Sequence, residues 1–144
     1  MKKSIYIIAV IFCAIVGCTT SKSSVIDKEK PTGIASDTVR IANDKLDYEV
    51  IIIDPGFSSW LISNAQPRNY YSQSYLESKN ELWISEWNSR VLQPTRYNPN
   101  LYEMTIDYNP SIDYGYEVNY LIYNYLVYFQ NTYKQKLFGY VPLR

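Results

Sequence analysis

The chain contains no histidine, and this absence excludes more chemistry than any other feature of its composition. Without imidazole there is no Ser-His or Cys-His nucleophile pair, no histidine metal site and no ordinary proton shuttle near neutral pH. Carboxylate, lysine, tyrosine and serine side chains remain for catalysis. The composition therefore favours a protein that is not an enzyme, and we expect neither a metal nor a cofactor.

Cysteine is also scarce. The two cysteines, Cys13 and Cys18, both lie near the amino terminus. If Cys13 leaves with a cleaved leader, the mature chain keeps one cysteine and cannot form an intramolecular disulfide. Soft metal sites then lack thiolate ligands as well.

Charge of one sign is not concentrated anywhere in the chain. Basic and acidic residues number 14 each, and they form no block of like charge. Nucleic-acid binding requires a basic patch, so we expect no nucleic-acid partner. A length of 144 residues suits a single domain.

The first 17 residues have the pattern of a leader peptide. Two lysines precede an apolar run from Ile5 to Val16, which is 12 residues long. Such a run is too short to cross a bilayer, since a membrane-spanning helix needs about 20 residues. We therefore expect residues 1–17 to be a signal peptide that is removed.

Cys18 follows Ile15-Val16-Gly17, and this sequence resembles the lipobox of bacterial lipoproteins. The resemblance implies cleavage before Cys18 and acylation of its thiol, which would anchor the chain at about 0.8 kcal/mol per buried CH₂ group. In the lipoproteins that this sequence resembles, a residue other than aspartate after the cysteine implies sorting to the outer membrane, and Thr19 holds this position. We expect the protein to lie on the periplasmic face of that membrane. A plain secretory leader followed by a free thiol is the alternative.

Residues 18–36 are polar and show no periodicity, with a break at Pro31-Thr32-Gly33. We expect a lipidated cysteine and flexible tether here, with a reach of roughly 25 Å. Residues 37–144 then form the globular domain. In chain order we expect strands over 38–41 and 46–53, a short helix ending before Gln66-Pro67, a helix over 72–92, a strand over 102–108 and a helix over 116–136.

The order β-β-α-α-β-α predicts an α/β (α+β) domain, with about three strands packed on three helices and a right-handed crossover to the last strand. Val50 to Ile53 is continuously apolar, which predicts a central strand covered on both faces. Asp54 is expected to cap the short helix, with Pro55 at its first position. Gly139 is expected to end the last helix in a left-handed conformation.

Sixteen tyrosines require either half-buried positions or a binding surface. Spacing places several on one stripe of the last helix. We expect this stripe to be the margin of the core, with a homodimer interface as the alternative. The stripe comprises Tyr116, Tyr120, Tyr123 and Tyr128.

Three clusters combine aromatic rings with arginine and asparagine, the residue types that dominate binding surfaces. They are Arg68, Tyr70 and Tyr71; Trp87, Asn88 and Arg90; and Arg96, Tyr97 and Asn98. They predict a site for an envelope protein or a cell-wall glycan. The alternative is that the rings fill the edge of a small core while Arg68 and Arg96 cap carbonyl groups. Glu86 and Arg90 are expected to form a surface pair.

Several carboxylates could in principle form the acid/base pair of a glycoside hydrolase, although no spacing brings any two of them together. They are Asp54, Glu86, Glu103, Asp107 and Asp113. A hydrolase acting on envelope polysaccharide is therefore the alternative function.

Several sequence blocks resemble a family of small uncharacterised bacterial lipoproteins. They are Ile52-Ile53-Asp54-Pro55-Gly56-Phe57, Tyr70-Tyr71-Ser72-Gln73, Glu86-Trp87-Asn88, Arg96 to Tyr102 and Tyr114 to Tyr120. The resemblance covers about residues 37–141. It implies one domain and an envelope location, and it assigns no activity.

Overall fold

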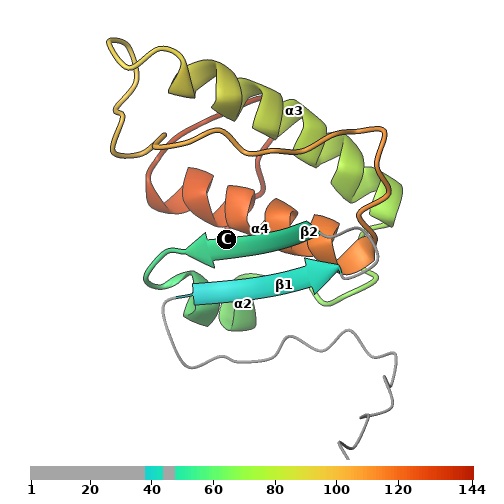
Figure 1. Ribbon diagram of the computed structural model, residues 1–144. Coiled ribbons are helices and arrows are strands. Elements are labelled where there is room, and N and C mark those ends of the chain that lie inside the picture. The colour runs from blue at the N-terminus through green and yellow to red at the C-terminus, as the bar shows by residue number, and fades with distance from the viewer. Residues whose placement is uncertain (1–37, 44–47) are drawn as a thin grey trace, which may run out of the picture.

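The computed structural model describes residues 38–43 and 48–144. The expected signal peptide, Cys18, the expected tether and the expected hairpin turn at 44–47 lie outside the described residues. The elements in chain order are β1 (Thr38–Asn43), β2 (Tyr48–Ile53), α2 (Phe57–Asn64), α3 (Gln73–Val91) and α4 (Tyr116–Thr132), as Figure 1 shows. This is a small single domain of the α+β class, as the sequence predicts.

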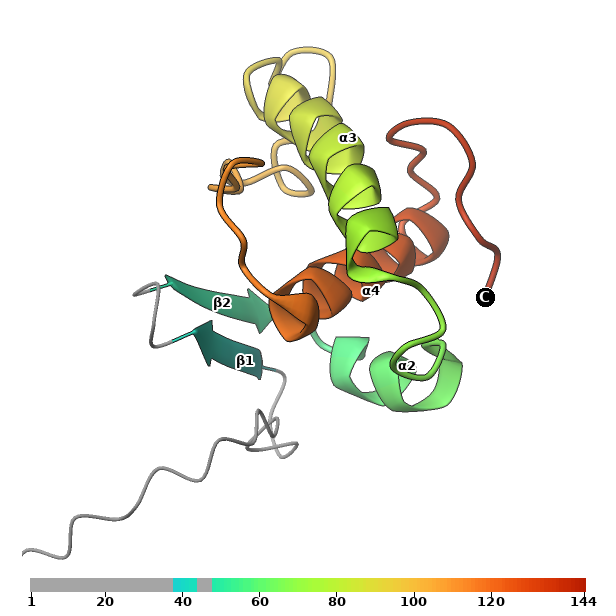
Figure 2. The ribbon, with the colours of Figure 1, turned by 90° about the vertical axis from the view of Figure 1, so that its right-hand side faces the viewer.

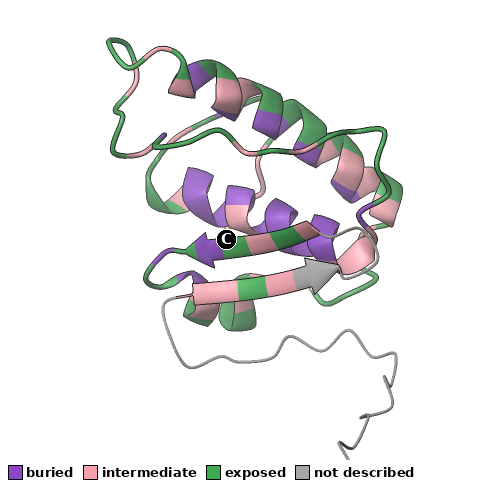
Figure 3. Cartoon of the chain, in the orientation of Figure 1, coloured by how far each residue is buried: buried purple, intermediate pink, exposed green. Residues whose placement is uncertain are grey.

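Helix α4 lies at the centre of the domain. α3 packs on one side of it, while α2 and the two strands pack on the other, so the fold has three layers (Figure 2). Twelve of the 17 residues of α4 are buried, and they follow each other around the helix (Figure 3). Within the described part of the chain, no helix combines the length and hydropathy needed to cross a membrane.

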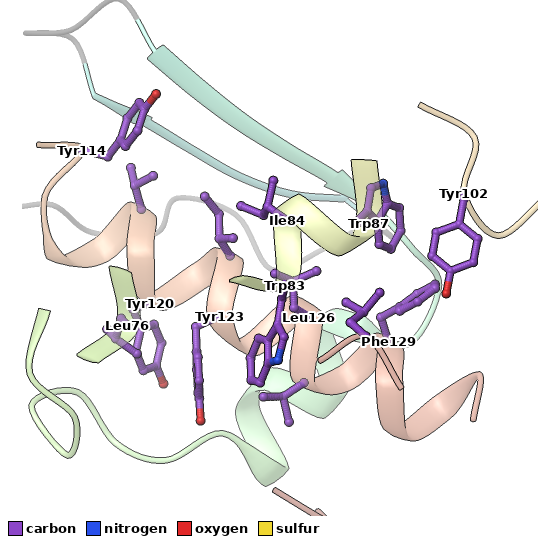
Figure 4. Packing of buried hydrophobic residues seen from close by; sticks show 14 residues of the cluster. Leu76, Trp83, Ile84, Trp87, Tyr102, Tyr114, Tyr120, Tyr123, Leu126 and Phe129 are labelled. Atoms are coloured by element: carbon purple, nitrogen blue, oxygen red, sulfur yellow. The ribbon is translucent and has the colours of Figure 1, made fainter. Parts of the chain in front are cut away.

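Burial on every side explains why α4 is helical despite its many tyrosines and valines, which favour strands in isolation. Tyr120, Tyr123 and Tyr128 of the predicted stripe are buried within the single chain, and Tyr116 is half-buried. The neighbouring layers thus cover the face that suggested a homodimer, and self-association itself stays a prediction. Figure 4 shows Tyr123 beside Trp83 of α3, where the two rings stack at 5.4 Å.

The polar residues of α4 do not form a solvent face. Asn119 and Asn124 are buried. The Asn119 side-chain oxygen accepts hydrogen bonds from Asn80 of α3 at 3.2 Å and from the Tyr108 hydroxyl at 2.8 Å. Asn124 donates to the Tyr120 carbonyl at 2.8 Å. Buried amides require such partners, and here α4, α3 and the chain before α4 supply them.

Helix α4 ends at Thr132, earlier than predicted, and Gly139 is not its cap. Lys134 takes the left-handed conformation, with φ of 53°, and the Gln135 amide donates to the Gln130 carbonyl at 3.1 Å. This is the closing bond of a Schellman motif. Gly139 does have φ of 61°, but it lies in the tail that follows.

Helix α3 begins where the sequence predicts, because the Ser72 hydroxyl accepts a hydrogen bond from the Tyr75 amide at 3.2 Å. Its buried residues include Leu76, Trp83 and Trp87, which lie at helical spacing on one side. Leu82 is exposed. Arg90, expected on the surface, is buried, because its planar fork bonds to a second segment of the chain as described below.

The sheet has two strands in place of the expected three. β1 and β2 form the predicted antiparallel pair, with Thr38 opposite Ile53 and Asn43 opposite Tyr48. The expected third strand, 102–108, is not assigned as a strand, so no crossover exists in the described residues. β2 is consequently not central: Ile51 is 51% and Ile53 74% exposed.

Asp54 does not cap α2. The cap position belongs to Gly56, whose φ of 96° suits glycine. The Asp54 carboxylate turns to the core, where it accepts hydrogen bonds from the hydroxyls of Tyr128 and Tyr133, each at 3.1 Å. Two phenols from the end of α4 thus bind the carboxylate that could have capped α2.

Candidate functional site

A cleft of about 750 Å³ lies along β2, on the side away from β1. One wall is the continuous stretch from Tyr48 to Pro55, and the other includes 100–101 and 103–107. The floor is apolar and comes mainly from α4, through Ile122, Tyr125 and Phe129. We call this site the β2 cleft. Because consecutive residues of β2 border it, the strand contributes its backbone edge and not only one face.

The outer wall of the cleft is fixed to α3 by side chains that bond to its backbone. The Trp87 indole nitrogen donates to the Met104 carbonyl at 2.9 Å. Asn88 donates to the Ile106 carbonyl at 2.9 Å and accepts from the Ile106 amide at 2.8 Å. An asparagine amide thus replaces the two bonds that a neighbouring strand would make.

The backbone of this wall therefore presents alternate residues to opposite sides. In an extended chain the polar groups of successive residues point in opposite directions. Met104 and Ile106 bond toward α3, so Thr105 and Asp107 turn toward β2. The Tyr48 hydroxyl, which donates to the Asp107 carbonyl at 2.8 Å, reaches it from that side.

The two walls do not pair with each other. Between the described residues of β2 and those of 100–107, no backbone hydrogen bond forms. A whole tyrosine side chain connects them at Asp107, whereas paired strands lie only about 4.8 Å apart. The cleft thus separates two extended backbone edges.

The charges around the cleft are all negative. Its acidic lining residues are Glu49, Asp54, Glu103 and Asp107, and its lining includes no lysine or arginine. Glu49 pairs with Arg40 of β1, whereas the described residues give Glu103 and Asp107 no cation. The exposed rim therefore carries two uncompensated carboxylates.

The tyrosines at the cleft are held in their protonated form. Burial raises the pKa of Tyr48 to about 12, and the nearby phenol of Tyr114 and carboxylate of Asp107 raise this pKa further. Burial, followed by the charge of Asp54, raises the pKa of Tyr125 and of Tyr133. These phenols are donors at neutral pH and are poorly suited to act as bases.

Metal binding finds no support in the geometry. In the described part of the chain, no three or more acidic or cysteine side chains gather closely enough to hold an ion. Of the five carboxylates that the sequence offered for catalysis, Asp54, Glu103 and Asp107 line the cleft. Glu86 instead binds Arg90, and Asp113 accepts a hydrogen bond from Gln73.

The second predicted cluster is used within the fold: Trp87 lines the cleft, whereas Asn88 and Arg90 do not. Trp87 is buried, and its ring contacts Phe129 at 4.6 Å and Tyr102 at 5.0 Å (Figure 4). Asn88 holds the outer wall through the two bonds to Ile106. Arg90, 8% exposed, binds Glu86 at 2.8 Å, the Tyr102 hydroxyl at 2.8 Å and the Lys136 carbonyl at 2.6 Å.

The third predicted cluster touches the second. The guanidinium of Arg90 lies 4.7 Å from the Tyr97 ring centre, and that of Arg96 lies 5.3 Å from it. Arg96 is exposed. The Asn98 side chain accepts a hydrogen bond from the Asn100 amide at 3.0 Å, which is the local turn expected of asparagine.

The first predicted cluster makes no contact with the other two in the described residues. Arg68 pairs with Glu117 at 2.7 Å and lies 4.9 Å from the Tyr120 ring centre. Tyr70 is exposed, and its ring meets Tyr71 edge-on at 4.8 Å. Tyr71 also stacks on Tyr75 at 4.5 Å. The structure thus separates the nine predicted residues into two places.

Sequence reasoning did not identify the β2 cleft. The alternation over 102–108 correctly indicated an extended segment, but it also suggested direct pairing with the sheet. The available signal was Asn88, two residues before the buried Arg90, since a side-chain amide can replace a strand partner. The four carboxylates come from two separate stretches, 49–54 and 103–107, and only the fold brings these stretches around one cleft.

Comparison with curated proteins and with solved structures finds no similar chain. A family described as "Family of unknown function (DUF6146)" matches residues 5–141. The matched stretch includes every residue that lines the cleft. The chain therefore belongs to the DUF6146 family.

Proposed function

We propose that the domain is a non-enzymatic binding module of the cell envelope and that it binds an envelope protein in the β2 cleft. In this proposal, a lipid on Cys18 holds the domain at the periplasmic face of the outer membrane. The observation that supports binding is the cleft itself: two extended backbone edges face each other over an apolar floor. Such edges recognise peptide chains through main-chain hydrogen bonds.

The same geometry favours a protein over a cell-wall glycan. Glycan binding relies on exposed ring faces. Trp87 lines the cleft but is buried against Phe129 and Tyr102. Among the aromatic residues of the lining, only Tyr133 is exposed, and its hydroxyl binds Asp54. Among the nine predicted residues, Tyr70 keeps an exposed ring, but it lies in the cluster that does not contact the cleft wall.

Photocrosslinking in intact cells tests the binding role. A photoreactive amino acid replaces Thr105, whose backbone faces the cleft, and a matched chain carries it at Ser85, an exposed position of α3. We expect one adduct of defined mass from position 105 and none from position 85. Absence of an adduct at 105, or the same adducts from both positions, would contradict the proposal.

Lipid anchoring is tested separately. Cys18→Ala removes the only thiol that the proposed mature chain retains. We expect this variant to leave the membrane fraction, because a soluble domain without acyl chains has too little apolar area for stable membrane binding. The control is Ser21→Ala, which leaves the acceptor thiol intact. Unchanged fractionation of the Cys18→Ala chain would refute the anchor.

A hydrolase is the second candidate, favoured by the four carboxylates that line one cleft. A glycoside hydrolase needs two carboxyl groups about 5–10 Å apart on either side of the scissile bond. The test is hydrolysis of envelope polysaccharide by the wild-type chain and by Glu103→Gln and Asp107→Asn. Activity that both substitutions abolish would replace the binding proposal with this one.

A further inference from the structure

We propose that the partner enters the β2 cleft as an added β-strand, and that it is an extended peptide segment with lysine or arginine beside its pairing residues. This inference rests on the proposed binding role and specifies the chemistry of the partner. It follows from the backbone of the two walls, from the composition of β2 and from the charge of the rim.

The backbone provides two edges for one strand. β2 pairs with β1 along one edge only, so alternate residues of 48–53 direct their amide and carbonyl groups toward the cleft. On the opposite wall, Met104 and Ile106 bond to α3 and the Asp107 carbonyl accepts from Tyr48, so alternation leaves the backbone groups of Thr105 to face β2. One inserted strand would pair with both walls and complete a four-stranded sheet.

The sequence of β2 lacks the features that usually protect an exposed edge. Edge strands commonly carry lysine, proline or a bulge that prevents pairing with another chain. Residues 48–53 read YEVIII and contain none of these residue types. Only the walls of the cleft therefore limit the pairing of β2 with another chain. A single extended segment can still enter the cleft and pair with it.

Charge defines the partner further. Glu103 and Asp107 are exposed on the outer wall and have no ion-pair partner in the described part of the chain. Lysine or arginine flanking the added strand would complement them. The apolar floor of Ile122, Tyr125 and Phe129 accommodates alternate apolar side chains of the same strand. The favoured partner is thus basic and alternately apolar.

Binding of designed peptides to the full chain tests the inference. The probe is a short dye-labelled peptide of alternating valine and threonine with a lysine pair at each end. A second peptide has glutamate in place of lysine, and a third keeps the lysines but has every other amide N-methylated. Fluorescence anisotropy gives the affinities, and hydrogen exchange identifies the protected amides.

We expect the lysine peptide to bind and to protect amides within 48–53 and 103–107. N-methylation removes several main-chain hydrogen bonds of about 1 kcal/mol each, so it is expected to weaken binding about 100-fold. Glu103→Lys is expected to weaken it about tenfold, because it replaces an attraction with a repulsion. Its matched control, Glu81→Lys on the exposed face of α3, should not change the affinity.

Equal binding of the N-methylated peptide would overturn strand addition, and equal binding of the glutamate peptide would overturn the basic partner. If protection of 48–53 instead increases with protein concentration and without peptide, a second copy occupies the cleft and the inference is wrong. If no peptide binds but position 105 still crosslinks in cells, strand addition fails while the binding role stands. If neither occurs, both proposals fail.

Discussion

Replacing Asn88 by alanine decides whether this residue is part of the fold or part of a binding surface. Its side chain makes two hydrogen bonds to the backbone of Ile106, at 2.9 Å and 2.8 Å. Each such bond contributes about 1 kcal/mol net, so their loss should lower the free energy of unfolding by about 2 kcal/mol. Ile106 is only half-buried, so water can bond to the freed groups and the cost should not greatly exceed this value.

Urea unfolding followed by tryptophan fluorescence measures this change, because Trp83 and Trp87 are buried and report on the core. The matched control is Asn98→Ala, which loses one hydrogen bond in an exposed turn and should cost less than about 0.5 kcal/mol. The Asn88→Ala chain should also show faster hydrogen exchange over 103–107. A cost below about 0.5 kcal/mol for Asn88→Ala would refute the assignment of this side chain to the fold.

Three further predictions concern the fold. Arg90→Ala should lower the free energy of unfolding by about 3 kcal/mol, since it leaves Glu86 and the carbonyls of 136–137 without their donor. Arg96 is exposed, so Arg96→Ala should change this free energy by less than about 0.5 kcal/mol. Equal effects of the two substitutions in urea unfolding would disprove the distinction. Lys134→Gly should raise the free energy of unfolding by about 1 kcal/mol, because the left-handed conformation strains lysine but not glycine. The same change at Lys136 should not raise it. A lower free energy of unfolding for Lys134→Gly would contradict this prediction. Stability should fall above about pH 10, because unfolded tyrosines ionise there while burial raises the pKa of folded Tyr48, Tyr108 and Tyr128 to about 12. The unfolded state then binds fewer protons than the folded state, so the free energy of unfolding decreases as the pH rises. Tyrosine absorbance and circular dichroism check this, and phenols that all titrate near pH 10 in an intact fold would refute it.

The sequence predicts the local elements better than their arrangement. The hairpin and the three helices form where periodicity indicates, and Ser72 caps α3 as its local sequence predicts, whereas Asp54 and Gly139 do not cap their helices. The third strand fails because alternation reports an extended chain but not its partner. Asn88 and Trp87 of α3 bind that segment, and alternation within 102–108 says nothing of these partners, which precede it in the sequence.

The core shows the same limit. Asn119 and Asn124 indicate a solvent face by residue type, yet both are buried, since α3 and α4 supply their hydrogen bonds. Arg90 is buried for the same reason. The composition of the cleft depends on β2, the 103–107 segment and α4 together, so its acidic rim could not be predicted from any one motif.

The central position of α4 has a consequence for when the chain can fold. The hairpin, α2 and α3 all precede α4 in the sequence, and each of them packs on it. During synthesis these early elements lack their largest apolar partner until the last quarter of the chain emerges, and isolated short helices are barely stable in water. The main core is therefore expected to close only when synthesis of the chain is nearly complete.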